Sequence, residues 1–116
     1  MSARRKGKDW EREVRDIFRA LGWEHAERTP CSGGLASWPG DLMGVEPFAV
    51  ECKADEHISV WSALAQARAA AERGSGIFPV VFLRRVRGRR AEVAVAMTVE
   101  TFRYLARQLR EGGGLA

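Results

Sequence analysis

The spacing of apolar residues changes along the chain, and each change predicts a different secondary-structure element. In residues 8–22 apolar side chains recur every three or four positions, which predicts a helix with one buried face that ends at Gly22. Residues 23–29 form a short mixed segment that fits a first strand. The Gly-, Ser- and Pro-rich residues 30–40 predict a loop after it.

The rest of the chain predicts further strands and two more helices. Runs rich in Val, Ile and Phe, or alternating in polarity, predict strands, and closely spaced alanines predict a helix packed tightly on a sheet. The strands are expected at 41–45, 48–53, 77–83 and 91–97, and the helices at 59–73 and from Thr98 to the glycines at 112–114. This order predicts an α/β fold with a central mixed five-stranded sheet flanked by helices.

Length and composition limit the organisation of the chain. With 116 residues and 46% apolar content it is long enough for one hydrophobic core, so residues 1–116 are expected to form a single domain. Residues 1–7 are predicted to be a flexible basic arm and residues 111–116 a flexible tail. No segment has the ~18 apolar residues of a membrane span or the core of a signal peptide, which predicts a cytoplasmic protein; nucleoid association or a viral origin is compatible. Cys31 and Cys52 have neither disulfide nor zinc spacing, and neither is assigned a catalytic role.

The net charge of +4 is distributed unevenly. Cations cluster near the N-terminus and around a predicted turn at residues 87–89. Clustered cations bind polyanions by releasing counterions, so nucleic acid is the expected partner, and an ordinary solvated surface is the alternative. The residues predicted to contact DNA on this ground are Arg4, Arg5, Lys6, Arg84, Arg85, Arg87, Arg89 and Arg90.

Two carboxylates come together if residues 41–53 form a hairpin. A turn near residues 44–47 and an antiparallel register centred on residue 46 would place Asp41 opposite Glu51. Like charges directly opposite each other destabilise a sheet, so this pair is expected to hold a cation. Oxygen ligands without His or Cys favour Mg²⁺ or Mn²⁺.

Side chains alternate in direction along a strand, which predicts where the residues next to Glu51 point. Glu51 and Lys53 should share one face, while Val50 and Cys52 point into the core. Lys53 could then orient or help deprotonate a water bound to the cation.

A third carboxylate could come from the first helix. Glu11 and Glu13 lie near opposite borders of its buried stripe, and helical geometry does not choose between them. Both could instead be solvated glutamates favoured by the helix dipole.

Four segments of the chain follow one another in a characteristic order: KGKDWERE at 6–13, RTPCSGG at 28–34, GD at 40–41 and ECK at 51–53. Together they resemble the PD-(D/E)xK nucleases in their archaeal-type Holliday-junction resolvase branch, over roughly residues 6–83. The resemblance implies a restriction-endonuclease-like fold. One departure is that the proline stands at Pro39, with Gly40 directly before Asp41, which leaves the metal-binding side chains intact.

The resemblance also implies roles for particular residues. It makes Glu11, Asp41 and Glu51 ligands of a divalent metal, Lys53 the residue that assists the attacking water, and the Cys52 carbonyl a further ligand. Ser32 would lie close to the DNA, although a simple turn residue is the alternative, and Arg28 would contact the DNA as well.

Metal binding near residues 41 and 51 and the basic clusters fit a Mg²⁺-dependent endodeoxyribonuclease that hydrolyses phosphodiesters, and the resemblance implies that its substrate is a four-way DNA junction. A symmetric junction requires two nearby active sites, which implies a homodimer. The alternatives are a nuclease of the same fold that acts on nicked, flapped or duplex DNA, and a noncatalytic module that binds nucleic acid. On the helix at 59–73, Gln66 could extend toward the active site, and Trp61 is expected in the core or at an interface.

Overall fold

The computed structural model describes residues 3–30, 40–74 and 78–112. Helices and strands alternate along the chain, as the apolar pattern predicts. The elements are α1 (Ala3–Ala20), β1 (Glu27–Arg28), β2 (Leu42–Met43), β3 (Phe48–Ala54), α2 (Val60–Arg73), β4 (Phe78–Arg87), β5 (Arg90–Met97) and α3 (Val99–Glu111).

The strands form two sheets, which corrects the expectation of one five-stranded sheet. In the larger sheet, of order β3-β4-β5, β3 pairs with β4 in parallel and β4 with β5 antiparallel. In the smaller, β1 and β2 pair antiparallel over two residues each. The small sheet meets β3 at an isolated bridge between Gly40 and Val50, and this contact is too short to join the two sheets.

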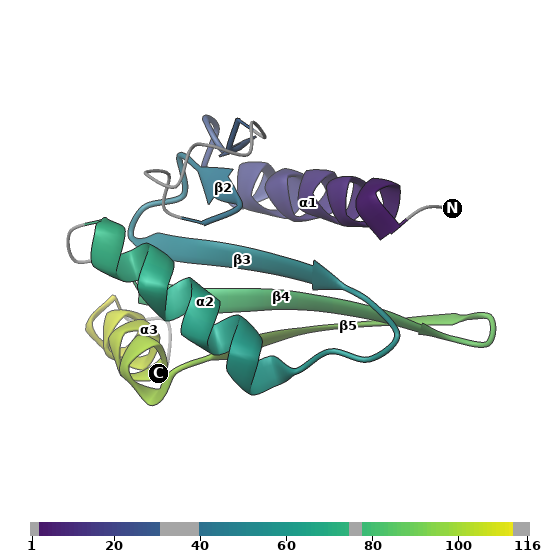
Figure 1. Ribbon diagram of the computed structural model, residues 1–116. Coiled ribbons are helices and arrows are strands. Elements are labelled where there is room, and N and C mark those ends of the chain that lie inside the picture. Colours follow the sequence, from purple (N-terminus) through teal and green to yellow (C-terminus); the bar gives the residue numbers. More distant parts are fainter. Residues whose placement is uncertain (1–2, 31–39, 75–77, 113–116) are drawn as a thin grey trace.

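Helices cover both faces of the larger sheet (Figure 1). On one face, Trp10, Val14 and Phe18 of α1 pack against a cluster that includes Val50 and Cys52 of β3. The indole of Trp10 also donates to the Phe82 carbonyl at 3.0 Å. The strand alternation predicted for residues 50–53 is therefore confirmed, since Val50 and Cys52 are buried and Glu51 and Lys53 are only half-buried.

The alanine-rich helix α2 packs on the opposite face. Ala63 and Ala67 lie against Val81 in a second apolar cluster, which confirms the predicted close packing. The helix is capped as expected, because the Ser59 hydroxyl accepts from the Ser62 N–H at 3.3 Å. Trp61 is 83% exposed, so the expectation that it lies in the core of the chain is wrong.

The first helix is longer than predicted. α1 begins at Ala3, so residues 3–7, expected as a flexible arm, lie in its first turns. This part of the chain has no apolar side chain larger than alanine, and the periodicity that predicts the helix therefore starts only at Trp10. None of the described helices is both long and apolar enough to cross a membrane.

The β4–β5 hairpin extends beyond the rest of the sheet (Figure 1). β4 continues to Arg87 and β5 starts at Arg90, so the predicted turn is in the right place but the strands are longer. The turn consists of Gly88 and Arg89, and Gly88 has φ +62°, a conformation that glycine adopts without strain. Most of the clustered arginines therefore lie on β4 and β5, where the strand register determines which face of the sheet each side chain occupies.

Candidate active site

Asp41 is held against the middle of β3 by both its backbone and its side chain. Its N–H donates to the Val50 carbonyl at 2.7 Å, and its carboxylate Oδ2 accepts from the Cys52 N–H at 2.8 Å. Its own carbonyl accepts from the Thr29 N–H at 3.0 Å. Asp41 thus bonds to β3 on both sides of Glu51.

Glu51 lies beside Asp41, and the two carboxyl groups affect each other. The pKa of Glu51 is raised to about 8, chiefly by burial and then by the charge of Asp41 and a hydrogen bond between the two side chains. The charges of Lys53 and Arg73 act in the opposite direction and lower this pKa. Two carboxyl groups this close are stable when a proton or a cation lies between them.

This contact arises differently from the predicted hairpin. Residues 45–48 do form a turn, in which the Phe48 N–H donates to the Val45 carbonyl at 3.0 Å. The strands on either side, however, pair with other partners, β2 with β1 and β3 with β4. The antiparallel register that placed residue 41 opposite residue 51 is therefore wrong, although the two side chains do meet.

Gly40 allows the close approach of Asp41 to β3. Its φ is +88°, and a Cβ at this position would lie 2.5 Å from the Val50 carbonyl oxygen. Any other residue would push the chain away from β3 at the point where Asp41 binds. The glycine that precedes Asp41 in place of the family's proline is therefore a structural requirement of this site.

Of the two helix glutamates, Glu11 is the one that faces the site. Its carboxylate accepts from Arg28 Nε at 3.0 Å, and the two side chains are 22% and 19% exposed. Burial raises the pKa of Glu11, the hydrogen bond from Arg28 lowers it, and the nearby charge of Asp41 raises it. Glu13 is exposed on α1. Glu11 is therefore the glutamate that lies near Asp41, and its role as a third acid stays a prediction.

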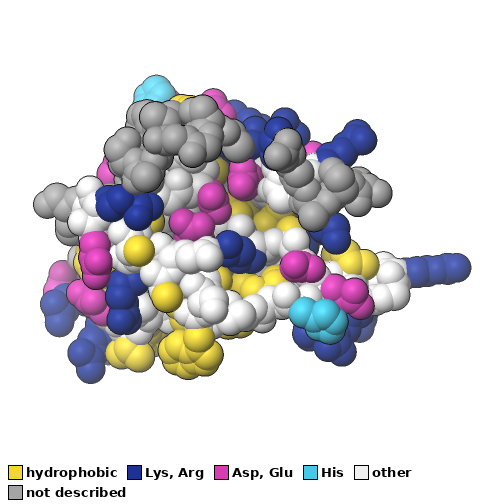
Figure 2. All heavy atoms as spheres, in the orientation of Figure 1, with side chains coloured by type: hydrophobic (Ala, Val, Ile, Leu, Met, Phe, Trp, Pro, Cys, Tyr) yellow, Lys and Arg dark blue, Asp and Glu magenta, His cyan; other side chains and the backbone are white. Residues whose placement is uncertain are grey.

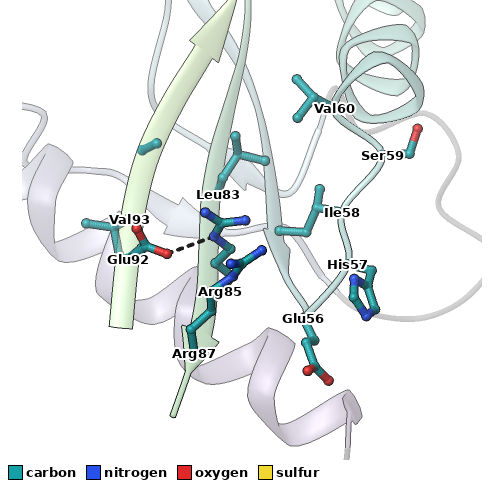
Figure 3. Close-up of a pocket in the computed structure, with 11 residues that line it drawn as sticks. Glu56, His57, Ile58, Ser59, Val60, Leu83, Arg85, Arg87, Glu92 and Val93 are labelled. Carbon is teal, nitrogen blue, oxygen red and sulfur yellow. Dashed lines mark hydrogen bonds and ion pairs between the residues drawn. The ribbon is translucent and has the colours of Figure 1, made fainter. Parts of the chain in front are cut away.

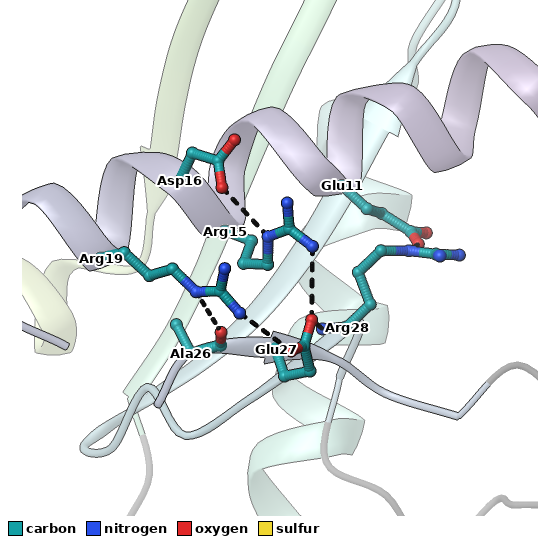
Figure 4. A network of polar contacts seen from close by, with 7 residues as sticks. All are labelled: Glu11, Arg15, Asp16, Arg19, Ala26, Glu27 and Arg28. Carbon is teal, nitrogen blue, oxygen red and sulfur yellow. Dashed lines mark hydrogen bonds and ion pairs between the residues drawn. The ribbon is translucent and has the colours of Figure 1, made fainter. Parts of the chain in front are cut away.

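A network of arginines on α1 positions β1 and, with it, Arg28 (Figure 4). Arg19 donates to the Ala26 carbonyl at 2.9 Å and to the Glu27 carboxylate at 2.8 Å. Arg15 donates to the same carboxylate at 3.4 Å. These contacts fix Arg28, the next residue, beside Glu11.

Lys53 and Gln66 line a common hollow of about 230 Å³ on the α2 side of the sheet, together with Ser62 and residues 57–59. The predicted position of Gln66, on a helix that extends toward the active site, is compatible with this arrangement.

The donor groups suit a hard cation with few protein ligands. Asp41 and Glu51 provide two carboxylates, and Mg²⁺ commonly binds one or two carboxylates while it keeps several waters. Within residues 3–30, 40–74 and 78–112, no three His, Cys, Asp or Glu side chains are grouped so that they could hold a metal ion. Glu11 is paired with Arg28. The described side chains therefore fit one ion held by two carboxylates, and the Cys52 carbonyl remains a predicted additional ligand.

The residues predicted to contact DNA fall into three groups. Arg28 lies at the site, beside Glu11. The arginines at 84, 85, 87, 89 and 90 lie on the β4–β5 hairpin, where Arg85 donates to Glu92 at 2.9 Å. Arg4, Arg5 and Lys6 are in the first turns of α1. Ser32 lies outside the described residues.

Two residues at the site were not singled out by the sequence. The Thr29 hydroxyl, like its N–H, donates to the Asp41 carbonyl, at 3.3 Å. Arg73, in the last turn of α2, is close enough for its charge to lower the pKa of Glu51. Neither has a local signal, because the contacts join residues 12 and 22 positions apart.

Comparison with known proteins supports the same chemistry. A family model described as "Phage putative PDDEXK endonuclease" matches residues 2–111. Neither the curated proteins nor the solved structures gave a match. The match covers nearly the whole chain and includes every segment that carries the acidic residues and Lys53. The chain therefore belongs to the family described as "Phage putative PDDEXK endonuclease".

Proposed function

We propose that the protein is a divalent-metal-dependent endodeoxyribonuclease that hydrolyses phosphodiester bonds in branched DNA. The observation that carries this proposal is the pair formed by Glu51 of β3 and Asp41, which is hydrogen-bonded to that strand, with the raised pKa of Glu51 and with Lys53 two residues further along the same face. Such a pair is costly to maintain unless it binds a cation. Membership of an endonuclease family makes DNA the expected substrate.

The residues of the site have distinct roles in this reaction. Asp41 and Glu51 hold Mg²⁺ or Mn²⁺, and the Cys52 carbonyl is a further ligand. When bound, the ion supplies a water of lowered pKa and neutralises charge on the phosphate. Lys53 would contact this water or the phosphate, and Glu11 would orient a water or hold a second ion if Arg28 turned to the DNA.

The basic residues bind the DNA backbone and confer no sequence preference. Arg28 lies beside Glu11, and the hairpin arginines would hold a more distant part of the DNA. Arg4, Arg5, Lys6 and Ser32 are further predicted contacts.

A four-way junction is the proposed substrate, cut by a homodimer, because the sequence resembles the junction resolvases. Flapped, nicked or duplex DNA is the alternative substrate within the same reaction class. A noncatalytic DNA-binding role is disfavoured, because a buried carboxylate pair beside bound phosphates would weaken binding.

The experiment is cleavage of end-labelled DNA by the purified protein in Mg²⁺, with four-way junction, flap and duplex substrates compared in parallel. Asp41→Asn and Lys53→Ala should each reduce the rate at least about a hundredfold, in the range usual for removal of a catalytic group. Asp16→Asn, which removes an exposed carboxylate on α1, is the matched control and should cleave at the wild-type rate. Wild-type rates for Asp41→Asn or Lys53→Ala would refute the mechanism. Equal rates on all substrates would refute only the junction preference.

A further inference from the structure

Strand register identifies which hairpin arginines share a face with Lys53. Lys53 lies beside Leu83 in the parallel β3–β4 ladder. Because side chains alternate along a strand, Arg85 and Arg87 lie on the same face as Leu83, about 7 and 13 Å further along β4. Across the hairpin, Glu92 is paired with Arg85, and Arg90 with Arg87.

A hollow of about 670 Å³ lies on this face, between the hairpin and the segment that leads into α2. Ile58 and Leu83 give it apolar walls, and Arg85 and Arg87 line its outer part (Figure 3). It adjoins the hollow that contains Lys53, because His57, Ile58 and Ser59 line both. A path of apolar and basic side chains therefore leads from Lys53 toward the hairpin tip.

The hairpin tip, at the outer end of this path, carries an excess of cations that favours an anionic ligand. Glu92 neutralises Arg85 through their 2.9 Å ion pair. Arg87 and Arg90 face each other as like charges, an arrangement that is unfavourable in a sheet unless an anion lies near them. Glu56 also lines the hollow, but its side chain points away from the Arg85–Glu92 pair (Figure 3). Figure 2 shows basic side chains beside a histidine near this end of the molecule, with acidic side chains next to them, and further basic side chains at the projecting tip.

We propose that this hollow binds a single, unpaired DNA strand next to the phosphate at Lys53. The apolar walls would contact one or two bases, and Arg87 and Arg90 the backbone phosphates, because an unpaired strand exposes both its bases and its phosphates. A duplex keeps its bases stacked inside, so it could contact the arginines but leave the apolar walls empty. The inference rests on the proposed function and narrows its substrate to DNA with unpaired nucleotides beside the cleavage position.

The experiment measures binding of fluorescent single-stranded and duplex oligonucleotides of equal length by anisotropy, with a chelator present so that no cleavage occurs. The wild-type protein should bind the single strand at least about fivefold more tightly than the duplex at the same salt concentration. Arg87→Ala and Ile58→Asp should each weaken single-strand binding about five- to tenfold and change duplex binding by less than about twofold. Arg107→Ala removes the same charge from α3, at the opposite end of the sheet, and should leave both affinities unchanged.

The outcomes separate this inference from the proposed function. Equal affinity for the two DNA forms, or Arg87→Ala and Ile58→Asp proteins that bind single strands as the wild type does, would overturn the inference even if Mg²⁺-dependent cleavage is observed. A single-strand preference that both substitutions abolish would support it even if no substrate is cleaved. Arg87 is exposed near the hairpin tip, so its truncation leaves the core intact, and thermal unfolding of both variants verifies their folding.

Discussion

At the residue level, the environment of Glu51 couples its ionisation to the stability of the protein. In the metal-free protein the pKa of Glu51 is raised from 4.5 to about 8, chiefly by burial and by Asp41. At pH values between 4.5 and about 8, Glu51 is ionised in the unfolded chain but keeps its proton in the folded protein. Stability should therefore fall as pH rises from about 4.5 to about 8, by up to about 1.4 kcal/mol per pH unit from this group.

The measurement is urea unfolding in chelator across this pH range, with Glu51→Gln as the comparison. Glutamine has nearly the same shape and does not ionise, so the difference in stability between the two proteins should grow in favour of Glu51→Gln as the pH rises. Added Mg²⁺ should stabilise the wild type more at pH 8 than at pH 6, since the ion binds the ionised form. A pH-independent difference between the two proteins would contradict the assigned pKa.

The Arg28–Glu11 pair also has a measurable consequence. Both side chains are about four-fifths buried, so removal of one partner leaves the other charge poorly solvated. Arg28→Ala should destabilise the protein by about 1–3 kcal/mol, and the Glu11→Gln/Arg28→Ala double variant should recover part of that loss. The matched control is Arg12→Ala, whose ion pair with Asp9 is roughly half exposed and should contribute less than about 1 kcal/mol. Equal losses from the two pairs would show that Glu11 is solvated.

At the element level, the sequence predicted helices and their caps, which depend on local spacing. It did not predict strand pairing, which depends on contacts between distant residues. The apolar stripe of α1 and the cap of α2 at Ser59 are local patterns, and both are present. The hairpin register was wrong because β3 finds its partner in β4, across the whole length of α2. Asp41 and Glu51 nevertheless meet, because Asp41 bonds directly to Val50 and Cys52 on either side of Glu51.

The small side chains of α2 allow it to pack close to the sheet, so a larger side chain at a buried position should destabilise the protein. Ala67 is fully buried against the cluster that contains Val81. Ala67→Leu should destabilise the protein by about 1–3 kcal/mol, because the added atoms would separate α2 from β4. Ala69→Leu, at an exposed position on the same helix, should have little effect, and chemical denaturation compares the two. If both variants are as stable as the wild type, α2 does not pack closely on the sheet.

At the scale of the whole molecule, the functional groups are spread along one extended body. The radius of gyration is 14.4 Å, slightly above the value of about 13 Å expected for a compact chain of this length, as a projecting hairpin would produce. The acidic pair lies where α1, β1 and β3 meet, and the arginines are carried outward by β4 and β5. The hairpin therefore provides a basic surface at some distance from the carboxylates, so that a long polyanion can contact both.

The proposed homodimer makes the last prediction. Trp61 and Val99 are 83% and 65% exposed and line a hollow of about 550 Å³ between α2 and α3, so this apolar surface is a candidate for an isologous contact. In sedimentation equilibrium the wild type should have about twice the 12.9 kDa mass of the chain. Trp61→Ala should shift the protein toward the monomer without lowering monomer stability, since a large exposed tryptophan contributes more to association than to folding. Leu21→Ala, which truncates a side chain that is 69% exposed at the end of α1, should remain dimeric. A wild-type protein that is monomeric at all concentrations would rule out the homodimer, whereas a dimeric Trp61→Ala protein would place the interface on another surface.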